Sequence, residues 1–145
     1  MSFNNTSTSQ TIYTRVVNRN SSNCFADGSF TLGITDLPIP TQPVDYEICD
    51  DDTDGSDING FVSSFLLSTK DAEILGGLDP TQYEVSYHTT LSGAQTDNAT
   101  DAIDKNNLYT NTSVNTQQIF VRVENTINAD CNLSLIHISE PTRPY

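Results

Sequence analysis

The sequence predicts an all-β fold, and three observations support this prediction. Thr, Asn, Ser and Asp dominate the polar residues, and their short side chains favour turns and strand surfaces over helix interiors. No long stretch repeats apolar residues with the i, i+3, i+4 spacing of an amphipathic helix. Several short segments instead alternate apolar and polar residues between turn-forming residues, as strands do.

The first predicted strands lie ahead of a proline-rich linker. After Cys24, the apolar residues Phe30, Leu32 and Ile34 alternate with polar neighbours, which is typical of a closing strand. The segment LPIPTQP, residues 37–43, follows. Its three prolines disfavour pairing in a sheet and predict a stiff connection between two modules.

The elements after the linker alternate between apolar runs and polar loops. Residues 60–67, GFVSSFLL, are dense in apolar residues and predict a strand buried on both sides. In residues 68–77, a capping-box-like pair and a Gly-Gly stop predict one short helical turn. Residues 83–88 alternate like a half-buried strand, and the polar residues 92–107 predict a long exposed loop. The strand predicted at residues 119–124 places Ile119, Val121 and Val123 on one face and Phe120, Arg122 and Glu124 on the other.

Together these segments give about seven short strands and one short helical turn in about 95 residues, which is the size of an immunoglobulin-like Greek-key sandwich. Another Greek-key sandwich with a different strand order is the alternative. Both are all-β folds.

A repeat relates the two ends of the chain. IYTRVVNRNSSNC, residues 12–24, and IFVRVENTINADC, residues 119–131, share Ile, Arg, Val, Asn and Cys at a constant offset of 107 residues, the difference between 119 and 12. A fixed period of this size is typical of tandem sandwich domains. We therefore expect residues 1–35 to be the C-terminal strands of a preceding repeat, and residues 36–132 to be one repeat that lacks its genuine last strand.

The match between the two copies stops after Cys131. Residues 133–143, LSLIHISEPTR, resemble the in-frame translation of a transposase-type sequencing-library adapter, and all eleven residues fit. We therefore expect residues 133–145 to be an adapter-derived artefact, with a natural tail as the alternative. Because an unpaired sheet edge costs stability, either residues 29–34 or SLIHI could take the place of the missing strand.

Charge and hydropathy exclude several classes of partner. The net charge is −13, with only six Lys and Arg, so the chain lacks the basic surface that nucleic acids and anionic membranes require. No stretch approaches the roughly 18 apolar residues of a membrane helix. We expect no nucleic-acid binding and no membrane insertion. The first ten residues also lack the basic and apolar regions of a signal peptide.

The acidic stretch ICDDDTDGSDING, residues 48–60, is the candidate metal site. Its D-x-D-x-D-G pattern can aim alternate carboxylates at one point, and Gly55 permits the sharp turn. A full EF-hand loop would need a Glu where Phe61 stands, so we reject an EF-hand. We predict instead that a Ca²⁺ ion is bound by carboxylates of this loop, with a solvated Asp-rich turn as the alternative. The predicted ligands are Asp50, Asp52, Asp54 and Asp57.

Features that would support catalysis are few. His88 is the one histidine outside the adapter-like segment, and we expect it to be exposed at a strand end. The sequence contains no nucleophile elbow, phosphate loop or zinc-ligand spacing. We therefore expect that the chain is not an enzyme.

The three cysteines predict a disulfide. No C-x-x-C pair is present, and Cys24 and Cys131 are equivalent in the repeat, so each full repeat carries two cysteines. We favour a Cys49–Cys131 disulfide within one repeat. A Cys24–Cys49 disulfide across the linker and free buried thiols are the alternatives. Disulfides would imply an oxidising compartment.

Four stretches, YEICDDDTDG, STKDAEIL, DPTQYEVSYH and IFVRVEN, resemble a repeat of large secreted, gliding-motility-associated proteins of Bacteroidota that use type IX secretion. The resemblance covers about residues 10–132 and identifies no catalytic residue. It implies immunoglobulin-like modules strung as a stalk in an adhesin-like protein, located outside the cell or at its surface. The implied partners are neighbouring repeats of the same chain, and surface glycans or other cell-surface proteins. Relative to that repeat, residues 56–60 resemble an insertion.

Two functions follow from these observations. We expect a non-catalytic extracellular structural or adhesion repeat. The alternative is a carbohydrate-binding, lectin-like accessory module, in which Tyr83, Tyr87 and Tyr109 would line the sugar site.

Overall fold

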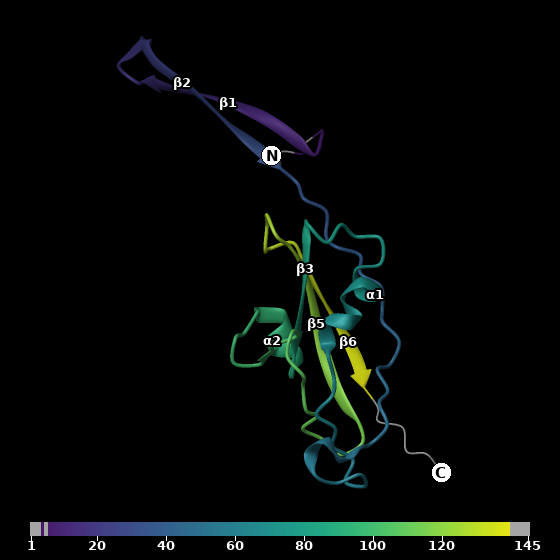
Figure 1. Cartoon of the computed structure of the whole chain (residues 1–145). Coiled ribbons are helices and arrows are strands. Elements are labelled where there is room, and N and C mark those ends of the chain that lie inside the picture. The colour runs from purple at the N-terminus through teal and green to yellow at the C-terminus, as the bar shows by residue number, and fades with distance from the viewer. Residues whose placement is uncertain (1–3, 5, 140–145) are drawn as a thin grey trace. The chain divides into compact units, whose positions relative to one another are not determined.

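The computed structural model describes residue 4 and residues 6–139, and the chain divides into two compact units, Met1–Asp36 and Leu37–Tyr145 (Figure 1). The described strands form two antiparallel sheets, one of two strands and one of four. Helices are short. The predicted all-β class is therefore confirmed.

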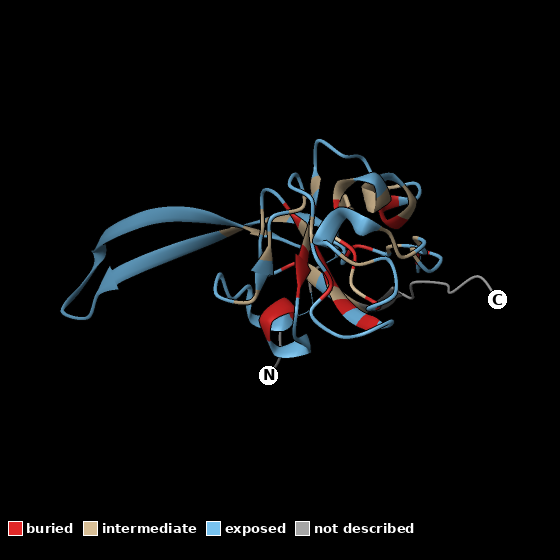
Figure 2. Cartoon of the chain, turned by 60° about the horizontal axis from the view of Figure 1, so that its bottom comes forward, coloured by how far each residue is buried: buried red, intermediate tan, exposed pale blue. Residues whose placement is uncertain are grey.

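The first unit is an antiparallel hairpin of β1 (Ser9–Asn18) and β2 (Ser21–Gly33). Arg15 and Asp27 lie opposite each other and form an ion pair with a distance of 2.6 Å from Nε to Oδ1. The Arg15 guanidinium also lies 4.1 Å from the centroid of the Phe25 ring. None of the described residues of this hairpin is buried, and most of it is pale blue in Figure 2. Two strands without a second layer cannot bury their side chains.

The second unit is built on a four-stranded antiparallel sheet. Its strand order is β4 (Ala102–Ile103), β3 (Tyr83–His88), β5 (Gln117–Asn125) and β6 (Asn132–Ser139). The alternation predicted for β3 and β5 is confirmed, because one face of both strands is buried. The buried apolar residues of this face are Val85, Tyr87, Ile119, Val121 and Val123.

The segment ahead of β3 covers that buried face. η2 (Leu67–Lys70) and α1 (Asp71–Leu75) form the predicted short helical turn. Residues 60–67, predicted as a strand, contain only an isolated bridge between Phe65 and Tyr109. The side chains of this segment still complete the core, through Val62, Phe65, Leu67, Ile74 and Leu75.

A second short helix, α2 (Leu91–Thr96), covers the opposite face of the sheet. The prediction of one long exposed loop for residues 92–107 is therefore wrong, since they hold most of α2 and all of β4. The Thr90 side chain accepts a hydrogen bond from the Gly93 N–H and caps the helix. Gly93 and Ala94 are buried, and a Cβ at Gly93 would lie 2.6 Å from the Asp101 Cβ. Small residues thus let α2 lie close to the chain beneath it.

The second unit contains four strands among its described residues, not the predicted seven or so. Residues 37–59 account for much of the difference, because they form no strand. Prolines have no N–H to donate, and the aspartates that follow close into a tight turn instead of pairing. This segment packs against the core through Tyr46 and Ile48, and the Thr41 N–H donates a hydrogen bond to the Ile74 carbonyl.

The adapter-like segment forms most of β6. Residues 133–139 pair with residues 123–117 of β5, so SLIHI lies along the edge of β5 that β3 does not cover. Residues 140–145 lie outside the described part of the chain. No helix in the part of the chain that the structure describes is long and apolar enough to span a membrane.

Candidate functional site

The predicted metal loop is a turn that caps itself. η1 (Asp52–Asp54) begins after Asp51, whose carboxylate accepts a hydrogen bond from the Thr53 N–H at 3.0 Å. The Thr53 hydroxyl also donates to this carboxylate, and both hydrogen bonds lower the pKa of Asp51, the hydroxyl more strongly. Gly55 ends the turn with a φ of 101°, in the left-handed region that glycine tolerates.

The other carboxylates of the loop also serve its own backbone and amide groups. Asp54 accepts from the Ser56 N–H and the Asn59 side-chain amide. Asp50 Oδ2 accepts from the Gly60 N–H at 2.7 Å, whereas its Oδ1 is buried and has no hydrogen-bond partner. The two remaining predicted ligands, Asp52 and Asp57, are exposed.

The described residues contain no cluster of three His, Cys, Asp or Glu side chains with the geometry of a metal site. The loop as folded therefore does not bring Asp50, Asp52, Asp54 and Asp57 together around one point. Within the loop, Asp50 Oδ1 is a buried side-chain oxygen without a hydrogen-bond partner. Calcium binding stays a prediction.

The acidic loop lies beside the Gln117 end of β5. Its last residue, Gly60, accepts a hydrogen bond from the Asn115 N–H at 3.0 Å, two residues ahead of that strand. Through the Asp50 side chain, this contact also fixes the neighbouring Cys49 at the same end of the sheet. Figure 1 shows the η1 loop at one end of the second unit.

Cys131 lies at the other end of β5. Its carbonyl accepts a hydrogen bond from the Asn125 N–H at 3.0 Å, at the turn that joins β5 to β6 (Figure 1). A strand of nine residues spans on the order of 25 Å. The structure therefore does not bring Cys49 and Cys131 together, although a disulfide requires Cα atoms within about 7 Å. The thiols of Cys24 and Cys49 are exposed, and Cys131 is buried.

His88 is completely buried, so the prediction of an exposed surface residue is wrong. It is the last residue of β3 and lies on the face that α2 covers. Its Nε2 atom lies 3.1 Å from the Ser86 hydroxyl and 3.9 Å from an Asp97 carboxylate oxygen. Burial lowers the pKa of His88, and the Arg122 guanidinium lowers it further, while Asp97 and Asp101 raise it. The sequence did not reveal this burial because α2 itself was not predicted.

Ser86, His88 and Asp97 do not form a catalytic triad. A triad needs the serine on one imidazole nitrogen and the carboxylate on the other. Here both groups face Nε2, and Nδ1 is buried without a hydrogen-bond partner. No carboxylate therefore orients the imidazole through Nδ1, so His88 is not held as a general base for Ser86.

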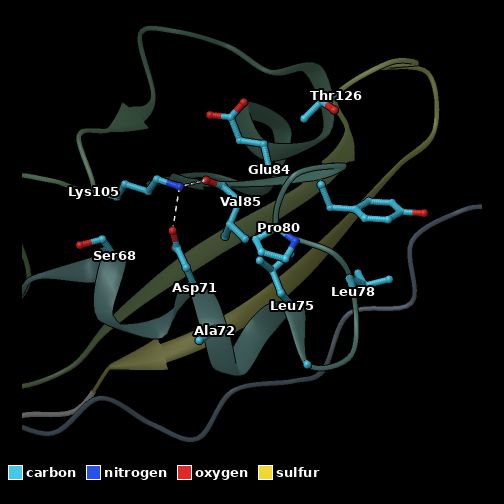
Figure 3. Close-up of a pocket in the computed structure, with 12 residues that line it drawn as sticks. Ser68, Asp71, Ala72, Leu75, Leu78, Pro80, Glu84, Val85, Lys105 and Thr126 are labelled. Atoms are coloured by element: carbon cyan, nitrogen blue, oxygen red, sulfur yellow. Dashed lines mark hydrogen bonds and ion pairs between the residues drawn. The ribbon is translucent and has the colours of Figure 1, made fainter.

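A pocket of about 670 Å³ opens beside β3 and α1 (Figure 3). Two of its charged groups form an ion pair, with Lys105 Nζ 2.8 Å from Asp71 Oδ2, and Lys105 also donates to the Val85 carbonyl at 2.8 Å. The Tyr87 hydroxyl donates to Asp71 Oδ1 at 2.8 Å. Burial and the nearby Asp71 charge strongly raise the pKa of Tyr87. The ion pair thus links three elements, and sequence inspection missed it because its members are 34 residues apart.

The three tyrosines of the predicted sugar site do not share one surface. Tyr83 lines the pocket, but the ring of Tyr87 is 1% exposed and belongs to the core. Tyr109 bridges to Phe65, and its hydroxyl accepts from the Gln117 side chain at 2.7 Å. The structure therefore leaves only Tyr83 in a position to contact a ligand in this pocket.

Comparison with known proteins gives one family match. The model of the Flavobacterium inter-domain disulphide bond domain matches residues 45–140, which is more than half of the chain. The matched range begins after the proline-rich linker and includes the acidic loop, both cysteines of the second unit and the whole four-stranded sheet. No curated protein and no solved structure matches the chain. The chain belongs to the Flavobacterium inter-domain disulphide bond domain family.

Proposed function

We propose that the chain is a non-catalytic structural module that connects consecutive domains of an extracellular or cell-surface protein through an inter-domain disulfide. The observation that carries this proposal is the family match, whose description names such a bond. The match covers the second unit, so a partner cysteine is needed in a neighbouring domain. The chain has one in its first unit, Cys24.

The exposure of Cys49 and Cys131 indicates which of them could form a disulfide with Cys24. Within this chain an inter-domain bond must use Cys24, because the other two cysteines both lie in the second unit. Cys49 is exposed and can be reached by a thiol from another domain, whereas Cys131 is buried. We therefore propose a Cys24–Cys49 disulfide.

This bond would join two neighbouring repeats, because Cys24 lies in the first unit and Cys49 in the second. Neighbouring repeats of the same chain are then the principal partners. A disulfide persists only in an oxidising compartment, which supports a location outside the cytoplasm. Adhesion to glycans or other surface proteins would be a property of the assembled stalk.

Peptide mapping of the oxidised chain tests this proposal. Under non-reducing conditions we expect one cross-linked peptide pair that joins Cys24 to Cys49, with Cys131 alkylated only after denaturation. Cys131→Ser is the matched control and should keep the cross-link, while Cys49→Ser should abolish it. A cross-link between Cys49 and Cys131, or no cross-link under oxidising conditions, would contradict the proposal.

A further inference from the structure

The two hairpins of the chain have the same strand register. In the first unit Ile12 lies opposite Phe30, and in the second unit Ile119 lies opposite His137, each residue shifted by 107 positions. The agreement extends over eight consecutive pairs, from the position of Gln10 to that of Val17. Strands β1 and β5 are thus equivalent and pair in the same register with the strand that follows, and only β5 has its cover in place.

The second unit shows what this hairpin packs against. Strand β3 pairs along the free edge of β5, and the apolar core segment covers one face. On the other face Arg122, 5% exposed, donates to the Ala94 carbonyl at 3.2 Å and to the Gln95 carbonyl at 3.3 Å, both in α2. Each surface of the hairpin therefore has an identified occupant.

The equivalent surfaces of the first unit are bare. Tyr13, Val16, Phe25 and Phe30 are each at least half exposed, and the Arg15 side chain, at the position of Arg122, is 57% exposed. In the described structure β1 pairs only with β2, so its other edge has no strand. A two-stranded hairpin with this much exposed apolar surface is only marginally stable in water.

We propose that hairpin β1–β2 is a docking surface for a second copy of the segment that precedes β5, residues 37–115, supplied by a preceding repeat. Its β3 strand pairs with the free edge of β1, and its α2 helix lies over the face that carries Arg15. Arg15 then donates to the last carbonyls of that helix, as Arg122 does in the second unit. The proposal rests on the proposed function only in that repeats follow one another in one chain.

Arg15 can change partners at little cost. Its present partner, Asp27, is more than half exposed, and exposed ion pairs contribute little because water screens them. In the second unit the residue opposite Arg122 is Ser134, and Glu124 supplies the carboxylate instead, at 2.7 Å. The guanidinium can therefore keep one carboxylate partner and still reach the helix with its remaining N–H groups.

A tandem chain tests the docking directly. In it, a second copy of residues 37–115 is joined directly to Ser9, and the sequence from Ser9 onward is unchanged. Hydrogen–deuterium exchange of this chain is followed by mass spectrometry. We expect the amides of residues 10–17 to exchange at least tenfold more slowly than in the present chain. Arg15→Ala should remove much of this protection in the tandem chain and change nothing in the present one. Arg19→Ala, at the exposed hairpin turn, is the control and should have no effect in either chain.

Equal exchange of residues 10–17 in the two chains would overturn the proposal. So would concentration-dependent protection in the present chain alone, because the hairpin would then be covered by a second hairpin. The experiment is repeated with Cys24→Ser and Cys49→Ser together. If protection of residues 10–17 persists in this variant, docking is supported even if the disulfide proposal fails. If the Cys24–Cys49 bond forms but residues 10–17 are not protected, only the docking proposal is refuted.

A second variant tests the same fit inside the folded unit. The β5 strand is converted to the β1 sequence by Gln118→Thr, Phe120→Tyr, Val121→Thr and Glu124→Val. If β1 can pair with β3 and pack under α2, the amides of residues 83–88 remain protected in this variant. Loss of that protection would show that β1 cannot replace β5 and would overturn the proposal.

Discussion

At the residue scale, His88 makes stability depend on pH. Burial lowers its pKa in the folded state, so the unfolded chain, with a value near 6.5, binds the proton more readily. Stability is therefore fully present above pH of about 6.5 and is lost as the pH falls towards the lower pKa of the folded state. The surrounding charges are Arg122, which disfavours protonation, and Asp97 and Asp101, which favour it.

We expect the melting temperature of the chain to fall between pH 7.5 and pH 5, measured by circular dichroism. His88→Gln, which keeps a polar side chain of similar size without titrating in this range, should flatten the dependence. The lowered pKa of Asp51 acts below this window and does not interfere. Equal slopes for the two proteins would show that another group controls the dependence.

Single residues also mark the limit of sequence interpretation. The Asp-rich turn and its Gly55 were predictable, because D-x-D-x-D-G is a local pattern and the turn forms within it. The burial of His88 was not predictable, because it depends on a helix that follows the strand and folds back over it. The separation of Cys49 and Cys131 is equally non-local, since it depends on which end of β5 each loop contacts.

At the scale of elements, Arg122 connects three parts of the second unit. From the middle of β5 its guanidinium donates to carbonyls of α2, to the Ala129 carbonyl in the β5–β6 turn and to Glu124. These carbonyls include helix-terminal groups that have no partner within the helix. One buried side chain thus holds a helix of six residues, which is too short to be stable alone, on the sheet.

Arg122→Ala should lower the free energy of unfolding by about 2–4 kcal/mol, because it leaves buried carbonyls and a carboxylate without their donor. Urea denaturation followed by circular dichroism measures the loss. Arg122→Lys keeps the charge without the planar fork and should recover only part of it. A loss no larger than that of Arg19→Ala, at an exposed turn, would show that α2 does not depend on this contact.

Elements differed in how well the sequence predicted them. β3, β5 and the short helical turn were predicted, because their periodicity and capping residues lie within the element itself. α2 has a polar sequence, LSGAQT, with no apolar stripe, and it forms because Thr90 caps it and Arg122 holds it. Residues 60–67 have the composition of a strand, but they pack as a cover with a single bridge to Tyr109.

At the scale of the whole molecule, the proposed Cys24–Cys49 bond limits how far the two units can move apart. It would hold two Cα atoms, one in each unit, within about 7 Å of each other. Small-angle X-ray scattering should therefore give a smaller radius of gyration for the oxidised chain than for the chain in reducing agent. Cys49→Ser should give the larger value under both conditions. A radius of gyration that does not respond to reduction in the unsubstituted chain would contradict this expectation.

Lys105 has a consequence for a protein in which such modules repeat. β4 pairs with only two residues of β3, so Val85 lies on a stretch of sheet edge that another chain could reach. The Lys105 ammonium donates a hydrogen bond to the Val85 carbonyl, and Asp71 holds the ammonium in place. An added strand would need this carbonyl as an acceptor and would meet the lysine charge there. Modules strung along one chain sit at high local concentration, which is the condition under which open edges of neighbouring sheets join into aggregates. In a protein in which such modules repeat, we therefore expect Lys105 to hinder the pairing of neighbouring sheet edges.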